Sequence, residues 1–380
     1  MKAHAPGLAA LLAGCVVLHG YLLATTYGAT YDIDSYVMQA YAATHHLNVY
    51  DYTLRYPYPP VWIWIVGGMS LLASAWHIPF NVAVKLPGSV GDVAMVVLLY
   101  AYARSRTGGL AALAPAALYA LNPIPALISA GHGQFDSLPA LFTVLAFHLR
   151  GPDQTRRLDL AALALGVAIA LKGYPFLVLP YLAMSSPPGR ILRTFLVALL
   201  PLLLSLGVYA ALVGFSPAML THVLGYTSSS DLGWSAVLER TPMPLLLYGV
   251  LWLGSDLAVI VFATIGPWLL FRRQVELGVT ALFAVFYLVI FRSSVQYLIW
   301  GLPFFCLALP WGTLLFSLAG TSALVTFYAR KFPNVVPFGA HDLPWAAVPA
   351  TTGSVIASAG VILLLSMAAV RAPRSRRSLN

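Results

Sequence analysis

The chain of 380 residues is 60% hydrophobic and only 9% charged, with a mean hydropathy of +0.82. That composition excludes a soluble domain of this length and indicates a polytopic membrane protein. The net charge of +9 does not point to nucleic acid, because the basic residues fall in short clusters between apolar runs. Cys15 and Cys306 lie inside such runs, which gives no support to a disulfide framework or a cysteine metal site.

The apolar runs predict an all-α bundle of roughly 11–13 transmembrane helices, in a single domain over residues 1–380. Residues 7–26 are long enough for a retained first helix and are not followed by a convincing cleavage site. The later runs cover residues 59–76, 82–103, 109–130, 135–149, 158–184, 194–214, 246–270, 275–291, 295–329 and 345–370. The run 295–329 is long enough for two spans that meet near Pro310.

The arginine clusters predict the sidedness of the bundle. The sidedness that places most basic residues in the cytoplasm puts 14 of the 21 inside and the loops 27–58 and 215–243 outside; Arg292 and Lys331 are among the seven left outside the cytoplasm. The 14 are Lys2, Arg104, Arg106, Arg150, Arg156, Arg157, Arg190, Arg193, Arg272, Arg273 and the four arginines of the basic tail 371–380. This sidedness, the preferred count of spans, requires residues 59–76 to cross the membrane only partly. It also requires residues 158–184, which are broken by "KGYP", to cross the membrane twice. The competing count has 59–76 as a full span and 158–184 as one kinked helix.

The first outer loop begins with "YDID". An extended backbone there would place Asp32 and Asp34 on one face, where they could hold a divalent cation or work as a general base and its neighbour. The alternative is a solvated helix start in which Asp34 or Ser35 caps the helix.

Further along this loop, an apolar stripe predicts a short helix on the membrane surface. The stripe comprises Val37, Ala40, Tyr41, Thr44 and Leu47. Four tyrosines follow, at positions 50, 52, 56 and 58, and they suit either an interfacial aromatic belt or carbohydrate binding. His45 and His46 give little support to zinc, because neighbouring helix residues point about 100° apart.

Ionisable residues inside apolar runs need a reason, because a charge at the bilayer centre costs about 2.5–3.5 kcal/mol on insertion scales. Lys85, Asp92, Asp136 and Lys172 are the clearest cases. Each could snorkel or form a structural ion pair. The preferred sidedness, however, brings all four to the outer ends of their helices, beside Asp32 and Asp34, and this favours a shared site. The second outer loop adds polar and aromatic candidates, namely His222, Tyr226, Asp231 and Trp234.

Six motifs, in order, resemble the family of GPI mannosyltransferase I catalytic subunits and related glycosyltransferases of the C superfamily (GT-C). They are "YDIDSY", "YPYPP", "KLPGSVGD", "LNPIPALISAGHGQFDS", "LKGYPFLVLPYL" and "SSVQYLIWGLPF", which span residues 30–305. One departure is "GHGQFDS", where the eukaryotic family reads R-G-N-A-[DE]-S. The departure puts the identity of the acceptor in doubt.

The resemblance implies an inverting hexosyltransferase, most simply a mannosyltransferase, which uses a sugar on a polyprenyl phosphate and faces the non-cytoplasmic side of the cell membrane. By analogy with the superfamily, Asp34 is the expected general base, and Asp32 is also required. Lys172 or Lys85 would neutralise the leaving phosphate. The expected substrate-binding residues are Tyr58, Asp92, His132, Gln134, Asp136, Tyr174, Asp231 and Gln296.

The chain lacks a glycine-rich phosphate fingerprint and a soluble nucleotide-binding domain, which favours a lipid-linked donor over a nucleotide sugar. The expected partners are therefore a polyprenyl-phosphate sugar, a lipid or glycan acceptor and membrane lipids. No cofactor is required, although Asp32 and Asp34 leave room for Mg or Mn. A polytopic lipid or sugar transporter or flippase is the alternative, since it would also gather intramembrane charges, but it usually shows repeated halves.

Overall fold

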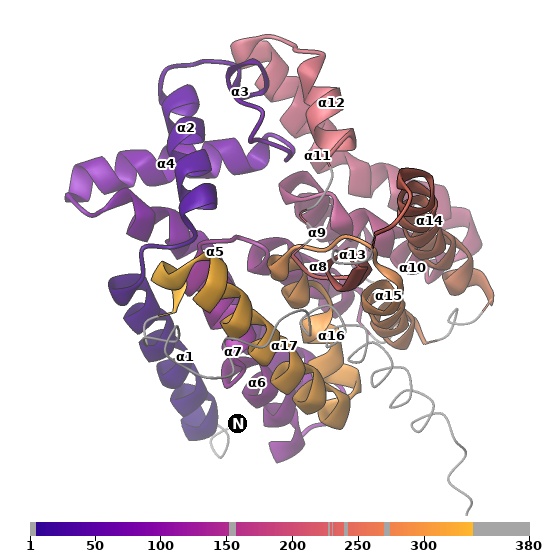
Figure 1. Cartoon of the computed structure of the whole chain (residues 1–380). Helices are drawn as coiled ribbons and strands as arrows, with labels where there is room; N and C mark the ends of the chain where they lie inside the picture. The colour runs from indigo at the N-terminus through magenta and orange to yellow at the C-terminus, as the bar shows by residue number, and fades with distance from the viewer. Residues whose placement is uncertain are drawn as a thin grey trace, which may run out of the picture.

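A computed structural model shows an all-helical protein (Figure 1). It describes residues 5–151, 157–226, 229, 231–238, 242–269 and 274–336. The predicted run 345–370 and the basic tail 371–380 lie outside these residues. Within the described part no strand is formed, and the only β-type pairing is an isolated bridge between Leu232 and Ser293.

Five helices are long and apolar enough to cross a membrane. They are α1 (Ala5–Thr25), α5 (Phe80–Arg104), Pro188–Val213, which combines a 3₁₀ turn with α11 (Ile191–Val213), α14 (Leu245–Leu269) and α17 (Pro310–Lys331). A sixth span is formed if the bent pair Leu110–Ala120 and Pro123–His132 is counted as one. The polytopic class is thus confirmed. Six further apolar helices have only 10–17 residues, which is why fewer full spans than the predicted 11–13 are present in the described chain.

The first outer loop contains two helices, α2 (Thr30–Thr44) and α3 (Val49–Tyr52). The run after it forms α4 (Val61–Trp76), which packs across α2 (Figure 1). The predicted surface helix is present as α2, and Val37 and Tyr41 lie on its exposed side. The predicted aromatic belt is wrong for three of its tyrosines. Tyr50, Tyr56 and Tyr58 are buried in a core beneath α2, because the chain turns inward at "YPYPP"; only Tyr52 is exposed.

The directions of α1 and α5 indicate whether the segment between them crosses the membrane. Thr26, just after α1, accepts a hydrogen bond from Lys85 near the start of α5, while His19 reaches Asp92 further along. The two helices therefore run antiparallel, so that α4 returns to the side on which it began. With 16 residues, α4 is about 24 Å long, too short to cross the hydrocarbon core. The structure agrees with the preferred count in this segment, and the side on which the first loop lies stays a prediction.

The run 158–184 turns back at the predicted break, but its two helices are short and are not among the candidate membrane spans, whereas the preferred count had the run cross twice. Helix α9 (Leu158–Leu171) ends at Lys172, and a 3₁₀ turn (Tyr174–Val178) leads into α10 (Leu179–Met184). At one end of this excursion Lys172 pairs with Asp136, and at the other Arg193 pairs with Asp159. The break falls at "KGYP" because proline and glycine interrupt the helical hydrogen bonds.

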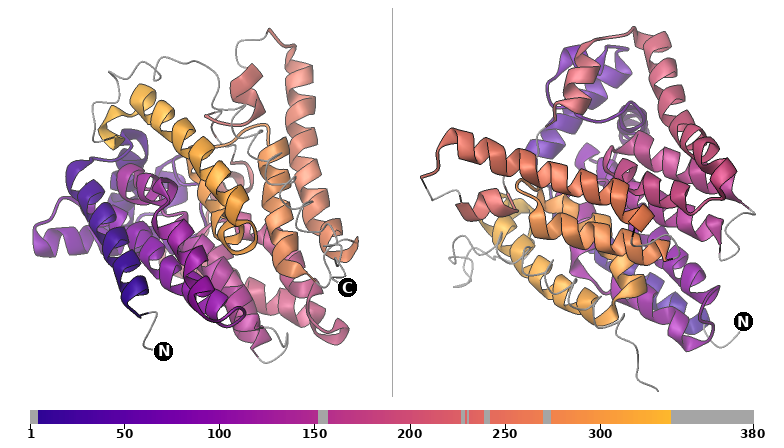
Figure 2. Two further views of the ribbon diagram at one scale, coloured as in Figure 1. Left: turned by 90° about the horizontal axis from the view of Figure 1, so that it is seen from below. Right: turned by 90° about the vertical axis from the view of Figure 1, so that its right-hand side faces the viewer.

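The centre of the molecule is built from α6 (Leu113–Ala120), α7 (Pro123–Ala126), a π-helical turn (Leu127–His132) and α8 (Ser137–Arg150). They pack with α5 and with α16 (Leu298–Ala308) in the largest apolar core. Helix α16 ends at Leu309 and α17 begins at Pro310, which confirms the predicted break. The second outer loop carries α12 (Ala218–Leu224) and α13 (Trp234–Leu238), and α15 (Val275–Val289) follows α14 (Figure 2).

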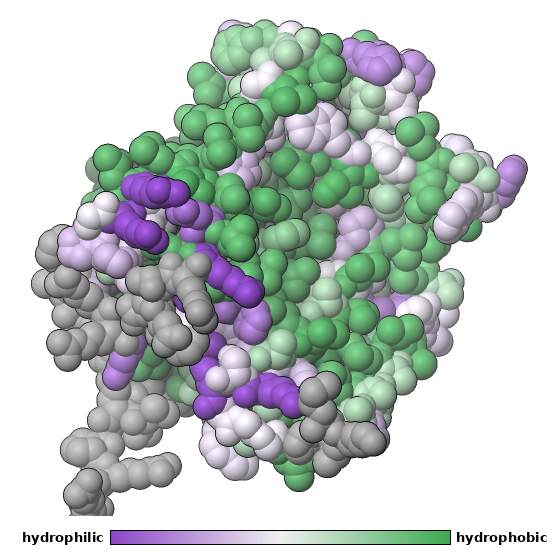
Figure 3. All heavy atoms as spheres, turned by 180° about the vertical axis from the view of Figure 1, so that it is seen from behind, coloured by the Kyte–Doolittle hydropathy of each residue, from purple (hydrophilic) through white to green (hydrophobic). Residues whose placement is uncertain are grey.

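The outer surface of the bundle is apolar. Only 17% of the most apolar stretch of α11 and 11% of that of α14 are buried, although both helices are strongly hydrophobic. Seen from behind, hydrophobic residues cover most of the molecule (Figure 3). Such a surface is stable only against lipid, since monomeric soluble proteins rarely expose contiguous apolar patches above a few hundred Å².

The sidedness can be tested with single cysteines, because both native cysteines are buried. Leu54 is 87% exposed in the first outer loop, and Arg104 is exposed at the opposite end of α5. We expect Leu54→Cys to react with a membrane-impermeant thiol reagent in intact cells, and Arg104→Cys to react only after permeabilisation. The reverse labelling pattern would refute the assignment of the loop to the outer side.

Candidate active site

Asp32 and Asp34 are separated by the helix that carries them. Helix α2 begins at Thr30, so the extended conformation predicted for "YDID" is wrong. Residues two apart on a helix point about 200° apart. Asp32 accordingly faces inward and its side chain is 25% exposed, whereas Asp34 is exposed and forms no hydrogen bond within the described chain. The two carboxylates therefore cannot act on one atom.

Asp32 is paired with His132. Its Oδ2 lies 2.5 Å from His132 Nε2, and the two residues are also joined through the main chain, where the Ala29 amide donates to the His132 carbonyl at 2.9 Å. Gly28 has φ +112° beside this carbonyl, a conformation that any other residue would strain. The start of α2 and the end of the π-helical turn are thus fixed against each other.

The environment keeps Asp32 ionised. Burial is the largest single effect and acts to raise its pKa. The hydrogen bond and the electrostatic interaction with His132, together with smaller effects of Gln134 and Lys172, outweigh it. The pKa of Asp32 therefore lies below its ordinary value. At neutral pH the group is a carboxylate that can accept a proton.

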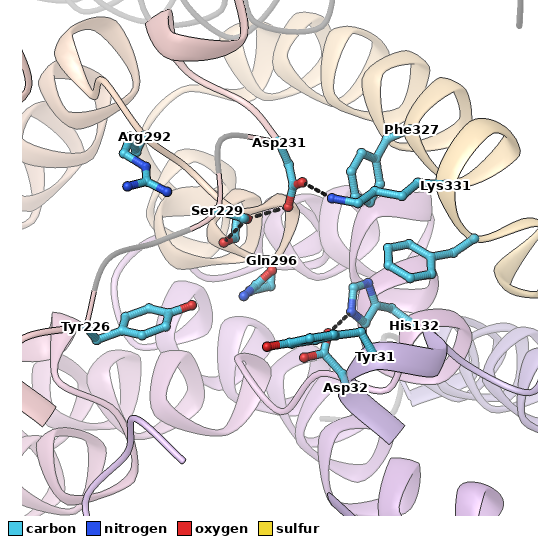
Figure 4. A pocket seen from close by; sticks show the side chains of 12 residues that line it. Tyr31, Asp32, His132, Tyr226, Ser229, Asp231, Arg292, Gln296, Phe327 and Lys331 are labelled. Atoms are coloured by element: carbon cyan, nitrogen blue, oxygen red, sulfur yellow. Dashed lines mark hydrogen bonds and ion pairs between the residues drawn. The ribbon is translucent and has the colours of Figure 1, made fainter. Parts of the chain in front are cut away.

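A cavity of about 490 Å³ opens beside this pair (Figure 4). Its walls come from α2, the turn at His132, the middle of the second outer loop, the segment after α15, and the end of α17. The lining residues are Tyr31, Asp32, His132, Tyr226, Ser229, Asp231, Arg292, Ser294, Gln296, Phe327, Lys331 and Phe332. In Figure 4 Arg292 and Tyr226 lie on the side opposite His132, with Gln296 between them.

The cavity holds two basic side chains in different states. Lys331 Nζ lies 2.7 Å from Asp231 Oδ1, so its charge is already balanced. Arg292 pairs with no carboxylate in the described part of the chain; it stacks over Trp252 at 5.1 Å, and its buried Nε has no hydrogen-bond partner. Arg292 is therefore the positive group in this cavity that is available to an anion.

The second outer loop is held against the segment that carries Arg292. Leu232 and Ser293 exchange main-chain hydrogen bonds of 2.8 and 3.1 Å, and the Ser235 amide donates to the Phe291 carbonyl at 2.8 Å. Gly233, with φ +88°, allows this approach, because a Cβ there would lie 2.9 Å from two carbonyl oxygens. Asp231 and Ser229 are thereby fixed at the rim of the cavity.

Lys172 does not line this cavity. Its Nζ lies 2.8 Å from both oxygens of Asp136, and Trp300 Nε1 donates to the same carboxylate at 2.6 Å. All three side chains are buried. The geometry thus does not favour the expected roles of Lys172 in binding phosphate and of Asp136 in binding sugar. The two residues neutralise each other's charge in an ion pair.

Two further intramembrane charges also have local partners. Asp92 accepts from His19 at 3.1 Å and from the Tyr119 hydroxyl at 2.6 Å, in a buried cluster that does not line the cavity. Lys85 donates to the Thr26 carbonyl at 2.6 Å and holds the end of α1. Both residues join helices and lie apart from the cavity walls.

The remaining candidates divide between the cavity and the core. His132, Asp231 and Gln296 line the cavity as expected. Gln134 does not line it, but its side chain interacts with the Asp32 carboxylate. Tyr174 is stacked on Trp300 with ring centroids 4.0 Å apart, and Tyr58 packs edge-on against Phe135; neither lines the cavity.

A metal site is not assembled by the described residues. No three side chains of His, Cys, Asp or Glu gather closely enough among them to hold an ion, and α2 directs Asp32 and Asp34 apart. A role for Mg or Mn stays a prediction.

The sequence reading missed Tyr31, Ser229, Arg292, Ser294, Phe327, Lys331 and Phe332 as cavity residues. A signal for two of them was present. Arg292 and Lys331 are among the few basic residues that the preferred sidedness leaves outside the cytoplasm. Basic residues that break the positive-inside pattern need an anionic partner, and this cavity offers a place for one.

Comparison with known proteins gives the class of chemistry. No curated protein matches the sequence. The profile of glycosyltransferase family 87 matches residues 56–294, more than half of the chain. This match confirms the glycosyltransferase class predicted by the resemblance, while the narrower likeness to GPI mannosyltransferase I subunits stays a prediction. The protein belongs to glycosyltransferase family 87.

Proposed function

We propose that the protein transfers a sugar, most simply mannose, from a polyprenyl-phosphate donor to a hydroxyl of a lipid or glycan acceptor on the non-cytoplasmic face of the cell membrane. The observation that carries this proposal is the cavity between Asp32 and Arg292: an ionised carboxylate on one wall faces an unpaired guanidinium on the other. In a glycosyltransferase these are the two charges that a displacement at the anomeric carbon needs.

The base in this proposal is Asp32 rather than Asp34. One oxygen of Asp32 accepts the proton of the acceptor hydroxyl while the acceptor oxygen forms its bond to the anomeric carbon. The bond from that carbon to the phosphate oxygen breaks, and its electron pair leaves with the polyprenyl phosphate. Arg292 would balance the negative charge that builds on this leaving group. Attack opposite to the leaving group inverts the anomeric centre.

A lipid-linked donor fits the charges and the surroundings of the cavity. Among the described residues that line the cavity, Arg292 is the cation without an ion-pair partner, because Lys331 is paired with Asp231. One such positive charge matches a phosphodiester with one negative charge. The regular structure of the described chain is helical, and the described residues form no sheet of the kind that binds nucleotides. The apolar surfaces of α11 and α14 are available to an isoprenoid chain within the bilayer.

The decisive experiment gives purified protein a polyprenyl-phosphate mannose and a lipid extract, and follows both release of polyprenyl phosphate and appearance of the sugar in product by mass spectrometry. In parallel, proteoliposomes are tested for movement of the same donor across the bilayer. Transfer supports the proposal. Movement of donor without transfer would favour the transporter alternative, and polyprenyl-phosphate glucose in place of mannose tests the identity of the sugar.

Replacing the unpaired cation should weaken transfer. We expect Arg292→Met to lower kcat on the order of 10²-fold, because an uncompensated charge then develops on the leaving group. Lys331→Met is the matched control, since Asp231 already balances that lysine, and it should lose only a few-fold. Equal losses in the two variants, or none in Arg292→Met, would contradict the assignment of Arg292 to the donor phosphate.

A further inference from the structure

A buried tyrosine stands behind the Asp32–His132 pair. Tyr328, on α17, is fully buried, and its hydroxyl lies 2.9 Å from His132 Nδ1. His132 Nε2 in turn lies 2.5 Å from Asp32 Oδ2. The three side chains form one line of hydrogen bonds, from the interior of the bundle to the carboxylate that faces the cavity.

The hydrogen-bond partners favour one tautomer of the imidazole. A carboxylate only accepts, so Nε2 must carry hydrogen. Tyr328 has one recorded hydrogen-bond partner in the described chain, namely Nδ1 of His132. If Nδ1 also carried hydrogen, the buried O–H of Tyr328 would have nowhere to donate, which is unfavourable. In one arrangement every polar atom has a partner. The Tyr328 hydroxyl donates to His132 Nδ1, and the His132 Nε2–H group donates to Asp32.

We propose that Tyr328 is a positioning residue for sugar transfer: by donating to Nδ1 it holds His132 in the Nε2–H tautomer, which in turn orients Asp32 and leaves its second oxygen free for the proton of the acceptor. This inference rests on the proposed function, in which Asp32 is the base. Tyr328 itself does not line the cavity, so it acts through His132.

Loss of the Tyr328 hydroxyl has a defined consequence for pH dependence. Without a donor at Nδ1, the Nδ1–H tautomer of His132 becomes populated and offers Asp32 a lone pair in place of a hydrogen. Burial then acts on Asp32 with less opposition, and the pKa of the carboxyl rises. Activity needs the carboxylate and is lost as pH falls through this pKa, so the acid limb of the profile must move upward. The other titratable or charged groups around Asp32, His132 and Tyr328 in the described chain are Tyr31, Tyr36, Tyr58, Asp136, Lys172, Tyr226, Asp231, Arg292 and Lys331.

The test is the pH profile of kcat for Tyr328→Phe, which removes one oxygen and keeps the ring. We expect kcat to fall about 3- to 10-fold at neutral pH, the usual effect of one neutral hydrogen bond, with KM for the donor unchanged and the acid limb displaced to higher pH. Tyr119→Phe is the matched control. It also loses a buried hydrogen bond, to Asp92, but outside the cavity, and its profile should keep the wild-type shape. An unshifted acid limb in folded Tyr328→Phe overturns the proposal.

Asp32→Asn separates this inference from the function on which it rests. If Asp32→Asn is inactive and Tyr328→Phe has the wild-type profile, the base assignment stands and the role of Tyr328 is refuted. If Asp32→Asn retains transfer, the base assignment itself fails. Should Tyr328→Phe fold poorly, Tyr328→Leu also removes the hydroxyl donor, and an acid limb identical to wild type in that variant likewise refutes the proposal.

Discussion

Asp32→Asn is expected to lower the rate of transfer about 10²- to 10⁴-fold, the range for loss of a general base. The amide keeps the shape of the carboxylate and still accepts from His132 Nε2, which lies 2.5 Å away in the native protein, so the fold around α2 should persist. The amide cannot take the proton of the acceptor hydroxyl. The measurement is kcat with a polyprenyl-phosphate sugar and purified protein, alongside the melting temperature.

Asp34→Asn is the matched control, since it makes the same chemical change two residues away. Asp34 is exposed, lies outside the cavity and forms no hydrogen bond in the described chain, so this variant should retain nearly wild-type kcat. The opposite pattern, with Asp34→Asn inactive and Asp32→Asn active, would restore the role expected from the resemblance. It would also mean that α2 rotates or unwinds when substrate binds.

Lys172→Met is expected to destabilise the protein by about 3–5 kcal/mol, because it leaves the Asp136 carboxylate charged and unpaired in the core. Trp300 still donates to that carboxylate, but a single neutral donor does not replace the ammonium. A lone lysine in an apolar run would carry an insertion cost, but here the lysine neutralises Asp136, so its removal costs stability. A lower apparent melting temperature in detergent micelles is the readout.

Two further variants sharpen this test. Lys172→Met combined with Asp136→Asn should recover most of the lost stability, since the neutral amide oxygen can still accept from Trp300. Arg193→Met breaks an ion pair with Asp159 whose partners are 62% and 42% exposed, and it should change stability by less than about 1 kcal/mol. Wild-type stability in Lys172→Met, with loss of transfer alone, would instead return Lys172 to the donor phosphate.

Much of the architecture could be read from local sequence. The membrane class follows from composition, the turn at 172–175 from "KGYP", and the start of α17 from Pro310. Each of these depends on a preference that acts within a few residues: apolar side chains leave water, and proline removes a helical hydrogen bond. The positive-inside rule likewise predicted that α1 and α5 run in opposite directions, because the rule depends on the basic residues beside each span.

The site was only partly readable. The motif "YDID" was predicted to contribute to the site, and its Asp32 lines the cavity. His132 and Gln296, which also line the cavity, were expected there as well. The choice between Asp32 and Asp34 was not accessible, because it depends on where α2 begins. The Ala29 amide is bound to the His132 carbonyl, and this contact between residues about a hundred positions apart sets that start. A different start would turn the other carboxylate inward.

The partners of the buried charges were decided by tertiary structure alone. Lys172, Asp136, Lys85 and Asp92 look alike in sequence, as ionisable residues in apolar runs. Packing pairs the first two with each other and gives the others local partners, which leaves Arg292 as the cation open to the cavity. Sequence determines that such charges must be compensated, since an isolated charge in a low dielectric is too costly. Which groups meet is set by the distances between helices far apart along the chain, and only the folded structure holds that information.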